Sequence, residues 1–413
     1  MKRKAALLFI TAPLLHAGNP APVTPPPAPQ WITPLIDIRA RYEYADVDGK
    51  DQSNAFTFRE RIGFKTMAWN GFSGLVEGEF TEVAGSDYNA NAGPDAYPYN
   101  PSNSVIADPG NAELNQAILQ YEGFDTIAKV GRQRIIYDNA AFIGNVGWRQ
   151  NEQTFDAISI SNKSIAGLTL NYAYLNQINR IYGNEADSQL TTKPLFDNVQ
   201  DIAASVNLFN VSYAGIKGVT LGGYAYIMNF HDKANWDNNT FGLSAKGDLL
   251  GVTLYGELAW QDKAGFNADN EAFYGHFMAT KTFGSQTLVL SIEQLNEGFK
   301  TPLATAHAFN GFSDVFVNGR LEGNHNGLTD VYVSHTIPLF YGIKWTNVLH
   351  AMGENEISTG YGWEYDSVLI KKFDDHFTAL AKLAHFESEG DAFVGTKSVP
   401  TTTRFSMELD YTF

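Results

Sequence analysis

The lengths of the connections between candidate strands constrain this chain more than any other feature. Apolar residues alternate with polar or charged ones in the segments 36–44, 72–81 and 404–413, and this period of two predicts strands with one apolar face and one wet face. The same pattern, followed along the whole chain, gives about 18 strands. They lie near 35–44, 56–68, 72–83, 112–121, 126–135, 154–162, 168–175, 201–213, 219–228, 239–249, 252–262, 271–283, 286–295, 327–336, 343–353, 360–373, 376–387 and 402–413.

Every second connection between these strands is short. The short ones are sequences such as WNG, EGFD, KSIAG, GIKG, LLG, GS and DD, whereas 84–111, 136–153, 176–200, 296–326 and 388–401 are long. The period alone does not separate a soluble β protein from a membrane barrel, but this alternation of lengths does. It predicts an all-β fold, a transmembrane antiparallel β-barrel with short periplasmic turns and long extracellular loops, closed by an even number of strands.

The N-terminus has the layout of a secretory signal peptide. A cationic start at 2–4 precedes an apolar run at 5–15 and small residues at Ala17 and Gly18, which predicts a signal peptide over 1–18. The proline-rich stretch 19–30 is expected to be an extended spacer, and 31–413 to be the barrel. Export and a membrane barrel together predict the bacterial outer membrane.

The last predicted strand ends on an aromatic residue, Phe413. A terminal aromatic is typical of bacterial outer-membrane proteins, whose barrel assembly machinery recognises the final strand. We therefore expect this machinery, outer-membrane lipid and lipopolysaccharide as partners.

Composition argues against several other functions. The chain has no cysteine, which excludes disulfides and thiol-based sites, and its formal charge of -16 argues against nucleic-acid binding. Its nine histidines stand singly, with no G-x-S-x-G motif and no pair at a metal-ligand spacing. We expect no enzymatic activity, no cofactor and no metal.

Charged residues on the wet faces of the first three strands are expected to line the lumen. The arginines of the first two strands would form a basic patch, since arginine presents a planar fork to carboxylates and keeps its charge at any pH. The glutamates of the third strand lie within cross-strand reach of the second, so the charges could instead neutralise one another. Both interpretations stay open for Arg39, Arg41, Arg59, Arg61, Glu77 and Glu79.

Two distinctive sequence motifs coincide with the predicted third and seventh outer loops. They are GRQRIIYDNAAFIGNVGWRQNEQTFDA at 131–157 and TPLATAHAFNGFSD at 301–314, and they occur together with RERIGF at 59–64, GFSGLVEGEFTE at 71–82 and ELNQAILQY at 113–121. Over most of the mature chain, this set resembles the alginate-export family of bacterial outer-membrane proteins.

The resemblance implies an 18-stranded monomeric barrel. It also implies a positively charged constriction through which an anionic polysaccharide leaves the periplasm. The lumen residues that it implies as selectivity residues are Arg59, Arg61, Arg132, Arg134 and Arg149.

We therefore expect a passive, porin-like outer-membrane channel for an anionic saccharide or a related organic anion. The alternative is a general or aromatic-acid uptake porin that uses the same barrel. The aromatic loop 296–326 could stack on sugars, close over the mouth as a gate, or pack only on itself. Its phenylalanines are Phe299, Phe309, Phe312 and Phe316.

Overall fold

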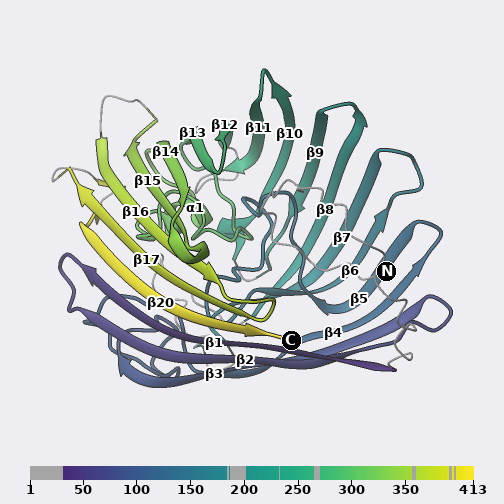
Figure 1. Ribbon diagram of the computed structural model, residues 1–413, viewed down its shortest axis with the longest axis horizontal. Coiled ribbons are helices and arrows are strands. Elements are labelled where there is room, and N and C mark those ends of the chain that lie inside the picture. Colours follow the sequence, from purple (N-terminus) through teal and green to yellow (C-terminus); the bar gives the residue numbers. More distant parts are fainter. Residues whose placement is uncertain are drawn as a thin grey trace.

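The computed structural model describes residues 31–183, 186, 201–231, 233–264, 270–355, 360–389, 393–394 and 397–413. The signal peptide and the spacer expected over 1–30 lie outside these residues. The described chain is an all-β, closed, antiparallel barrel of 18 strands (Figure 1), which confirms the predicted fold class.

The strands follow one another around the barrel in chain order, and β1 pairs with the last strand to close the sheet. A small hairpin of β18 (Phe393–Val394) and β19 (Lys397–Ser398) and one short helix, α1 (Val317–Glu322), lie in outer connections. The barrel strands are β1 (Ile32–Val47), β2 (Ser53–Thr66), β3 (Phe72–Asp87), β4 (Asn111–Gly123), β5 (Thr126–Gln133), β6 (Thr154–Asn162), β7 (Leu168–Asn179), β8 (Asp201–Ile216), β9 (Val219–Met228), β10 (Asn238–Leu249), β11 (Val252–Ala264), β12 (Asn270–Phe283), β13 (Gln286–Leu295), β14 (Leu328–Pro338), β15 (Lys344–Gly353), β16 (Gly360–Lys372), β17 (Phe377–Ser388) and β20 (Thr402–Thr412).

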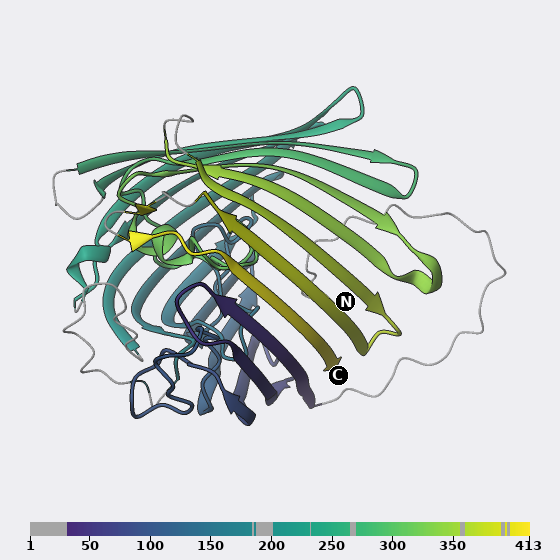
Figure 2. The same ribbon diagram turned by 90° about the vertical axis from the view of Figure 1, so that its left-hand side faces the viewer.

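The turns at one end of the barrel are short. Between β2 and β3, Trp69 and Phe72 exchange two backbone hydrogen bonds of 2.8 and 2.9 Å around Asn70 and Gly71, both of which have positive φ. An Asn-Gly pair suits this tight hairpin turn, and a Cβ on Gly71 would lie 2.6 Å from the carbonyl oxygen of Glu122. Long connections leave the other end, and Figure 2 shows the strands running obliquely between the two ends.

Both faces of the wall follow the predicted alternation. Apolar side chains such as Val76, Phe80 and Leu119 are exposed on the outer face, whereas Arg41 and Glu79 are buried on the inner face. This is the arrangement that a hydrocarbon surround favours, because apolar atoms then meet lipid and charges meet one another inside. None of the helices in the described part of the chain is long and apolar enough to cross a membrane.

Two outer loops fold into the barrel and meet there. The first connects β5 to β6 (134–153) and the second connects β13 to β14 (296–327). The amide of Gly144 donates to the carbonyl of Leu303 at 2.8 Å, and the amide of Thr305 donates to the carbonyl of Ala140 at 3.0 Å. These two segments, called the inner loops below, occupy the lumen and position the candidate site.

Candidate functional site: two inner loops between two walls

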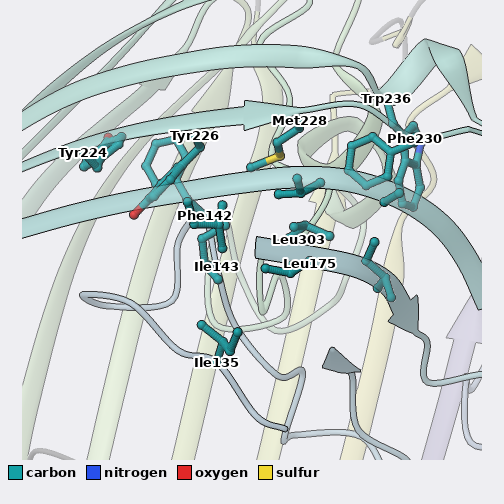
Figure 3. Packing of buried hydrophobic residues seen from close by; sticks show 14 of the residues in the cluster. Ile135, Phe142, Ile143, Leu175, Tyr224, Tyr226, Met228, Phe230, Trp236 and Leu303 are labelled. Atoms are coloured by element: carbon teal, nitrogen blue, oxygen red, sulfur yellow. The ribbon is translucent and has the colours of Figure 1, made fainter. Parts of the chain in front are cut away.

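On one side of the lumen the inner loops pack against an apolar wall formed mainly by β6–β9 and β11–β13. Figure 3 shows Phe142 and Leu303 of the loops beside wall residues such as Tyr226 and Leu175. The ring of Phe142 lies 5.2 Å from that of Tyr224, 5.2 Å from that of Tyr274 and 6.0 Å from that of Phe299. Leu303 is fully buried in the same cluster. This packing fixes the position of the loops without using any charge.

Tyrosines suit this wall because each combines an apolar ring with a polar end. Tyr224 donates to Glu257 at 2.8 Å, and Tyr274 donates to Glu293 at 2.7 Å. Arg320, in α1, donates to the two oxygens of Glu293 at 2.9 and 3.0 Å. The second inner loop is therefore also tied to the wall through one buried ion pair.

On the opposite side, β1, β2, β3 and β20 form an ionic wall. Arg39 pairs with Asp410 at 2.7 Å, and Arg61 pairs with Glu79 at 2.5 Å. Arg59 pairs with Asp37. Each pair joins neighbouring strands whose register places the two residues opposite or next to each other.

Arg41, the remaining lumen arginine of β1 and β2, pairs with one carboxylate of an outer loop and one of β20. Arg41 contacts Asp108, from the 88–110 connection, at 3.1 Å and Glu408 of β20 at 3.3 Å. Asp108 is fully buried. The sequence placed this aspartate in a long loop, and its role as an inner partner was missed.

The arginines of the first inner loop are also paired. Arg134 contacts Glu77 at 2.6 Å and also Glu152. Burial opposes the charged form of Glu152, but Arg61 and Arg134 lower the pKa of its carboxyl to about 2. Glu152 therefore stays ionised and links the loop to the wall at neutral pH.

Arg149 holds the two inner loops and the wall together. Its guanidinium lies 3.1 Å from Glu43 of β1, 3.7 Å from Asp108 and 2.7 Å from Asp314 of the second loop. Arg404 of β20 contacts Glu43 as well, at 3.2 Å. Five segments of the chain, namely β1, the 88–110 connection, the two inner loops and β20, therefore meet at one buried cluster of opposite charges.

Of the two interpretations of the lumen charges, the geometry agrees with mutual neutralisation. The expected lumen arginines of strands β1 and β2 and of the first inner loop each have a carboxylate within 4 Å. The acidic residues of β3 are among these partners. The residues concerned are Arg39, Arg41, Arg59, Arg61, Arg134, Arg149, Glu77 and Glu79.

Arg132 departs from the expected inward set. It shares a face of β5 with Val130, which is 47 % exposed on the outer surface, whereas the neighbouring Gln133 is 1 % exposed and bonds to Ser159 inside. Its guanidinium pairs with Asp156 at 2.8 and 3.1 Å. Side chains two residues apart in a strand lie on the same face. Arg132 is two residues from the outward-facing Val130, so it points away from the lumen.

A third group of side chains fills the throat between the inner loops and β17. Trp148 stacks on His307 at 4.5 Å and 5°, and His307 stacks on Phe312 at 5.3 Å. The Lys382 ammonium lies 3.4 Å from the centre of the Trp148 ring and 3.9 Å from that of Phe312. The cavity among these side chains measures about 10 Å³, which is the space of about one water molecule.

Sequence reasoning missed Lys382 and His307 as site residues. Trp148 and His307 do lie in the two distinctive motifs, and these motifs were the available signal for them. Lys382 is the one charged residue on the inner face of β17, which it shares with Leu380 and Ala384. A single inward-facing lysine among apolar residues was the sequence signal for Lys382.

Above the throat lies a cavity of about 320 Å³, called the vestibule below. Apolar residues from both inner loops and from other outer connections supply much of its lining, among them Val146, Tyr182 and Trp236. Arg149 and Arg404 also line it, and His307 and Arg404 line both the vestibule and the throat. Within the described ranges, no group of three or more acidic or imidazole side chains could hold a metal ion.

The chain is similar in structure to several solved outer-membrane proteins. OccAB1 of Acinetobacter baumannii superposes with a TM-score of 0.65 at 12 % identity, covering 92 % of this chain and 96 % of that one. OpdK of Pseudomonas aeruginosa, solved with vanillate, gives 0.64 at 11 % identity, with 92 % and 98 % covered. OpdQ of Pseudomonas aeruginosa gives 0.63 at 11 % identity, with 93 % and 99 % covered.

These similarities correct the resemblance to the alginate-export family. The solved structures are outer-membrane porins of the Occ and Opd type and not alginate exporters. No family model and no curated protein matches the sequence. At this level of identity the likeness establishes the fold of an outer-membrane porin barrel, and the motifs at 131–157 and 301–314 mark the inner loops and not an alginate channel.

Proposed function

We propose that this protein is a passive outer-membrane porin for the uptake of small organic anions, aromatic carboxylates in particular. This is the uptake alternative that the sequence left open. The barrel fold, shared with OccAB1 and with the vanillate-bound OpdK, supports a channel in the bacterial outer membrane. The lining of the vestibule supports small organic anions as the class of solute.

The vestibule is the observation that carries the proposal. Its volume of about 320 Å³ is at the lower end of the range of small-molecule sites, about 300–1,000 Å³. Its lining combines apolar side chains with Arg149 and Arg404. An aromatic ring would bury apolar surface there while its carboxylate met the N–H groups of Arg149 and Arg404 that Glu43 and Asp314 do not occupy. A guanidinium has five such donors and suits the planar carboxylate group.

The ionic wall also favours a small anion over a charged polymer. A polyanion in a narrow pore needs many unpaired positive charges, because each carboxylate that loses water must regain that energy electrostatically. Here the guanidiniums are already engaged by carboxylates of the chain. A single carboxylate needs only one or two groups to recognise it.

The test compares vanillate with vanillyl alcohol, which has the same ring and no charge. Purified protein in proteoliposomes is exposed to each solute at equal concentration, and the influx is measured. We expect vanillate to enter faster than the alcohol and faster than a sugar of similar size. Equal rates for vanillate and the alcohol would refute anion uptake, and no flux of either above protein-free vesicles would refute a porin.

A further inference from the structure

Lys382 differs from the arginines around it because it has no carboxylate partner in the described chain. Its side chain is buried, with the residue 8 % exposed, and no Asp or Glu oxygen of the described residues lies within 4 Å of its ammonium. Asp314 and Glu408 interact with it from farther away, and both are held closely by other groups, Asp314 by Arg149 and Glu408 by Arg41.

The contacts that Lys382 does make are weak substitutes for an anion. An ammonium carries three N–H donors. One meets the Nε2 of His307 at 2.9 Å, and the remaining neighbours are the faces of Trp148 and Phe312. A cation over aromatic faces is stabilised, but a carboxylate would be a better partner for it.

The acceptor at His307 depends on a neutral imidazole. Its Nδ1 lies 2.6 Å from Asp314, so the Nδ1–H donates to the carboxylate and leaves Nε2 free to accept from Lys382. Burial, together with the nearby Lys382, lowers the pKa of His307 to about 4, although Asp314 opposes this change. At neutral pH the ring is therefore uncharged, and its Nε2 can accept a hydrogen bond from the ammonium of Lys382.

Donors without a partner surround the same point. Ser406 lies directly opposite Lys382 in the β17–β20 pairing and lines the throat. The residue is 3 % exposed, and its hydroxyl has no hydrogen-bond partner among the described residues. The buried indole N–H of Trp148 also lacks a partner within the described part of the chain. A buried donor without an acceptor costs free energy, so this corner of the throat is prepared for an anion.

The throat must also change before any organic solute can pass it. Its cavity of about 10 Å³ admits no aromatic acid. The side chain of Lys382 extends from β17 to Trp148 of one inner loop and to His307 and Phe312 of the other. It is thus one contact that joins β17 to both loops across the throat.

We propose that Lys382 is a latch that a small organic carboxylate releases. In the resting channel its ammonium ties both inner loops to β17. A carboxylate that reaches the throat from the vestibule takes the ammonium, together with the Ser406 hydroxyl, and withdraws it from His307 and Trp148. The side chains of Trp148, His307 and Phe312 are then free to move away from Lys382 and the throat widens for the solute, while the apolar and ionic walls keep the loops inside the barrel. This inference rests on the proposed function, because it assumes that organic anions enter the vestibule.

The test records single channels in planar bilayers, with solute added on the side of the long loops. For the wild type, we expect vanillate to raise the conductance and vanillyl alcohol to leave it unchanged. Lys382→Met keeps an apolar stem for the aromatic faces and removes the charge. We expect this variant to conduct more at rest and not to respond to vanillate.

Two further variants make the result interpretable. Ser406→Ala should shift the vanillate response to about tenfold higher concentration, the contribution of one hydrogen bond to a charged group. Lys65→Met removes an equal charge from the inner face of β2, four residues beyond Arg61, and should respond like the wild type. Ser406→Ala also provides the test if Lys382→Met does not fold, which heat-shift gel migration reveals.

The outcomes separate the two proposals. If vanillate does not cross the wild-type channel, the proposed function fails. If vanillate crosses and the conductance of Lys382→Met and Ser406→Ala responds with an unshifted concentration dependence, the latch fails while the proposed function stands. A response of the wild type to vanillyl alcohol would also overturn the latch, because the ring and not the carboxylate would then open the throat.

Discussion

The two walls of the lumen hold the same inner loops by different physics. On the apolar wall, Phe142 and Leu303 are packed among aromatic rings. On the ionic wall, Arg149 and Glu152 join the loops to strands through buried charges. Packing tolerates small shifts of the loops because it has little direction, whereas buried charges tolerate none without leaving an ion unpaired.

This difference suggests a division of labour. The apolar wall keeps the loops inside the barrel and so sets how much space remains. The ionic wall sets the balance of charge along the passage, and with it the preference for one sign of ion. Changes on the two sides should therefore affect different measured quantities.

The largest effect is expected from Arg149→Met. Removing this guanidinium leaves Glu43, Asp108 and Asp314 with too little compensation in a buried cluster. Breaking such a cluster costs about 3–5 kcal/mol, here in the free energy that docks the inner loops. The excess carboxylate should also shift the channel toward cations. Reversal potentials in a salt gradient, together with limited proteolysis of the 134–153 loop, measure both effects.

Arg134→Met is the matched control. It lies in the same loop and also contacts two carboxylates, but its side chain is 30 % exposed, so water compensates the loss in part. If both variants changed the reversal potential and the protease sensitivity equally, burial would not be what makes the ionic wall sensitive.

Leu303→Ala should loosen the other anchor and leave selectivity unchanged. Removing a fully buried leucine side chain costs about 2–5 kcal/mol through lost transfer energy and the cavity left behind. We expect higher conductance and an unaltered reversal potential. Leu290→Ala removes the same atoms from the exposed outer face of β13 and should change neither quantity. A shifted reversal potential in Leu303→Ala would end the division between the walls.

The barrel could be predicted from the sequence because its determinants are local. The period-two alternation in 36–44 and the Asn70-Gly71 turn are each encoded within a few residues. The outer face of every strand also contacts the same lipid environment, so one pattern applies to all strands. The inward position of Arg59 and Arg61 and the pairing of Arg61 with Glu79 follow from the same alternation and register.

The site could be predicted only in part because its contacts join distant segments. The pairing of Arg41 with Asp108 spans 67 positions, and that of Lys382 with His307 spans 75. No periodicity encodes how two loops fold into a barrel and which charges they meet there. The lumen arginines were therefore expected as an open basic patch as much as a neutralised one, and Lys382 was not singled out.

The smallest effect is expected from Arg132→Gln, on the outer face. Its pair with Asp156 is partly exposed, with side chains 21 % and 28 % accessible, and such pairs contribute at most about 1 kcal/mol. Because Arg132 does not face the lumen, the reversal potential should match the wild type, whereas Arg149→Met shifts it strongly. A selectivity change in Arg132→Gln comparable to that of Arg149→Met would place this guanidinium in the ion path. The assignment of inward and outward faces in β5 would then be wrong. The charged lumen wall and the outer face would no longer differ in their influence on permeation.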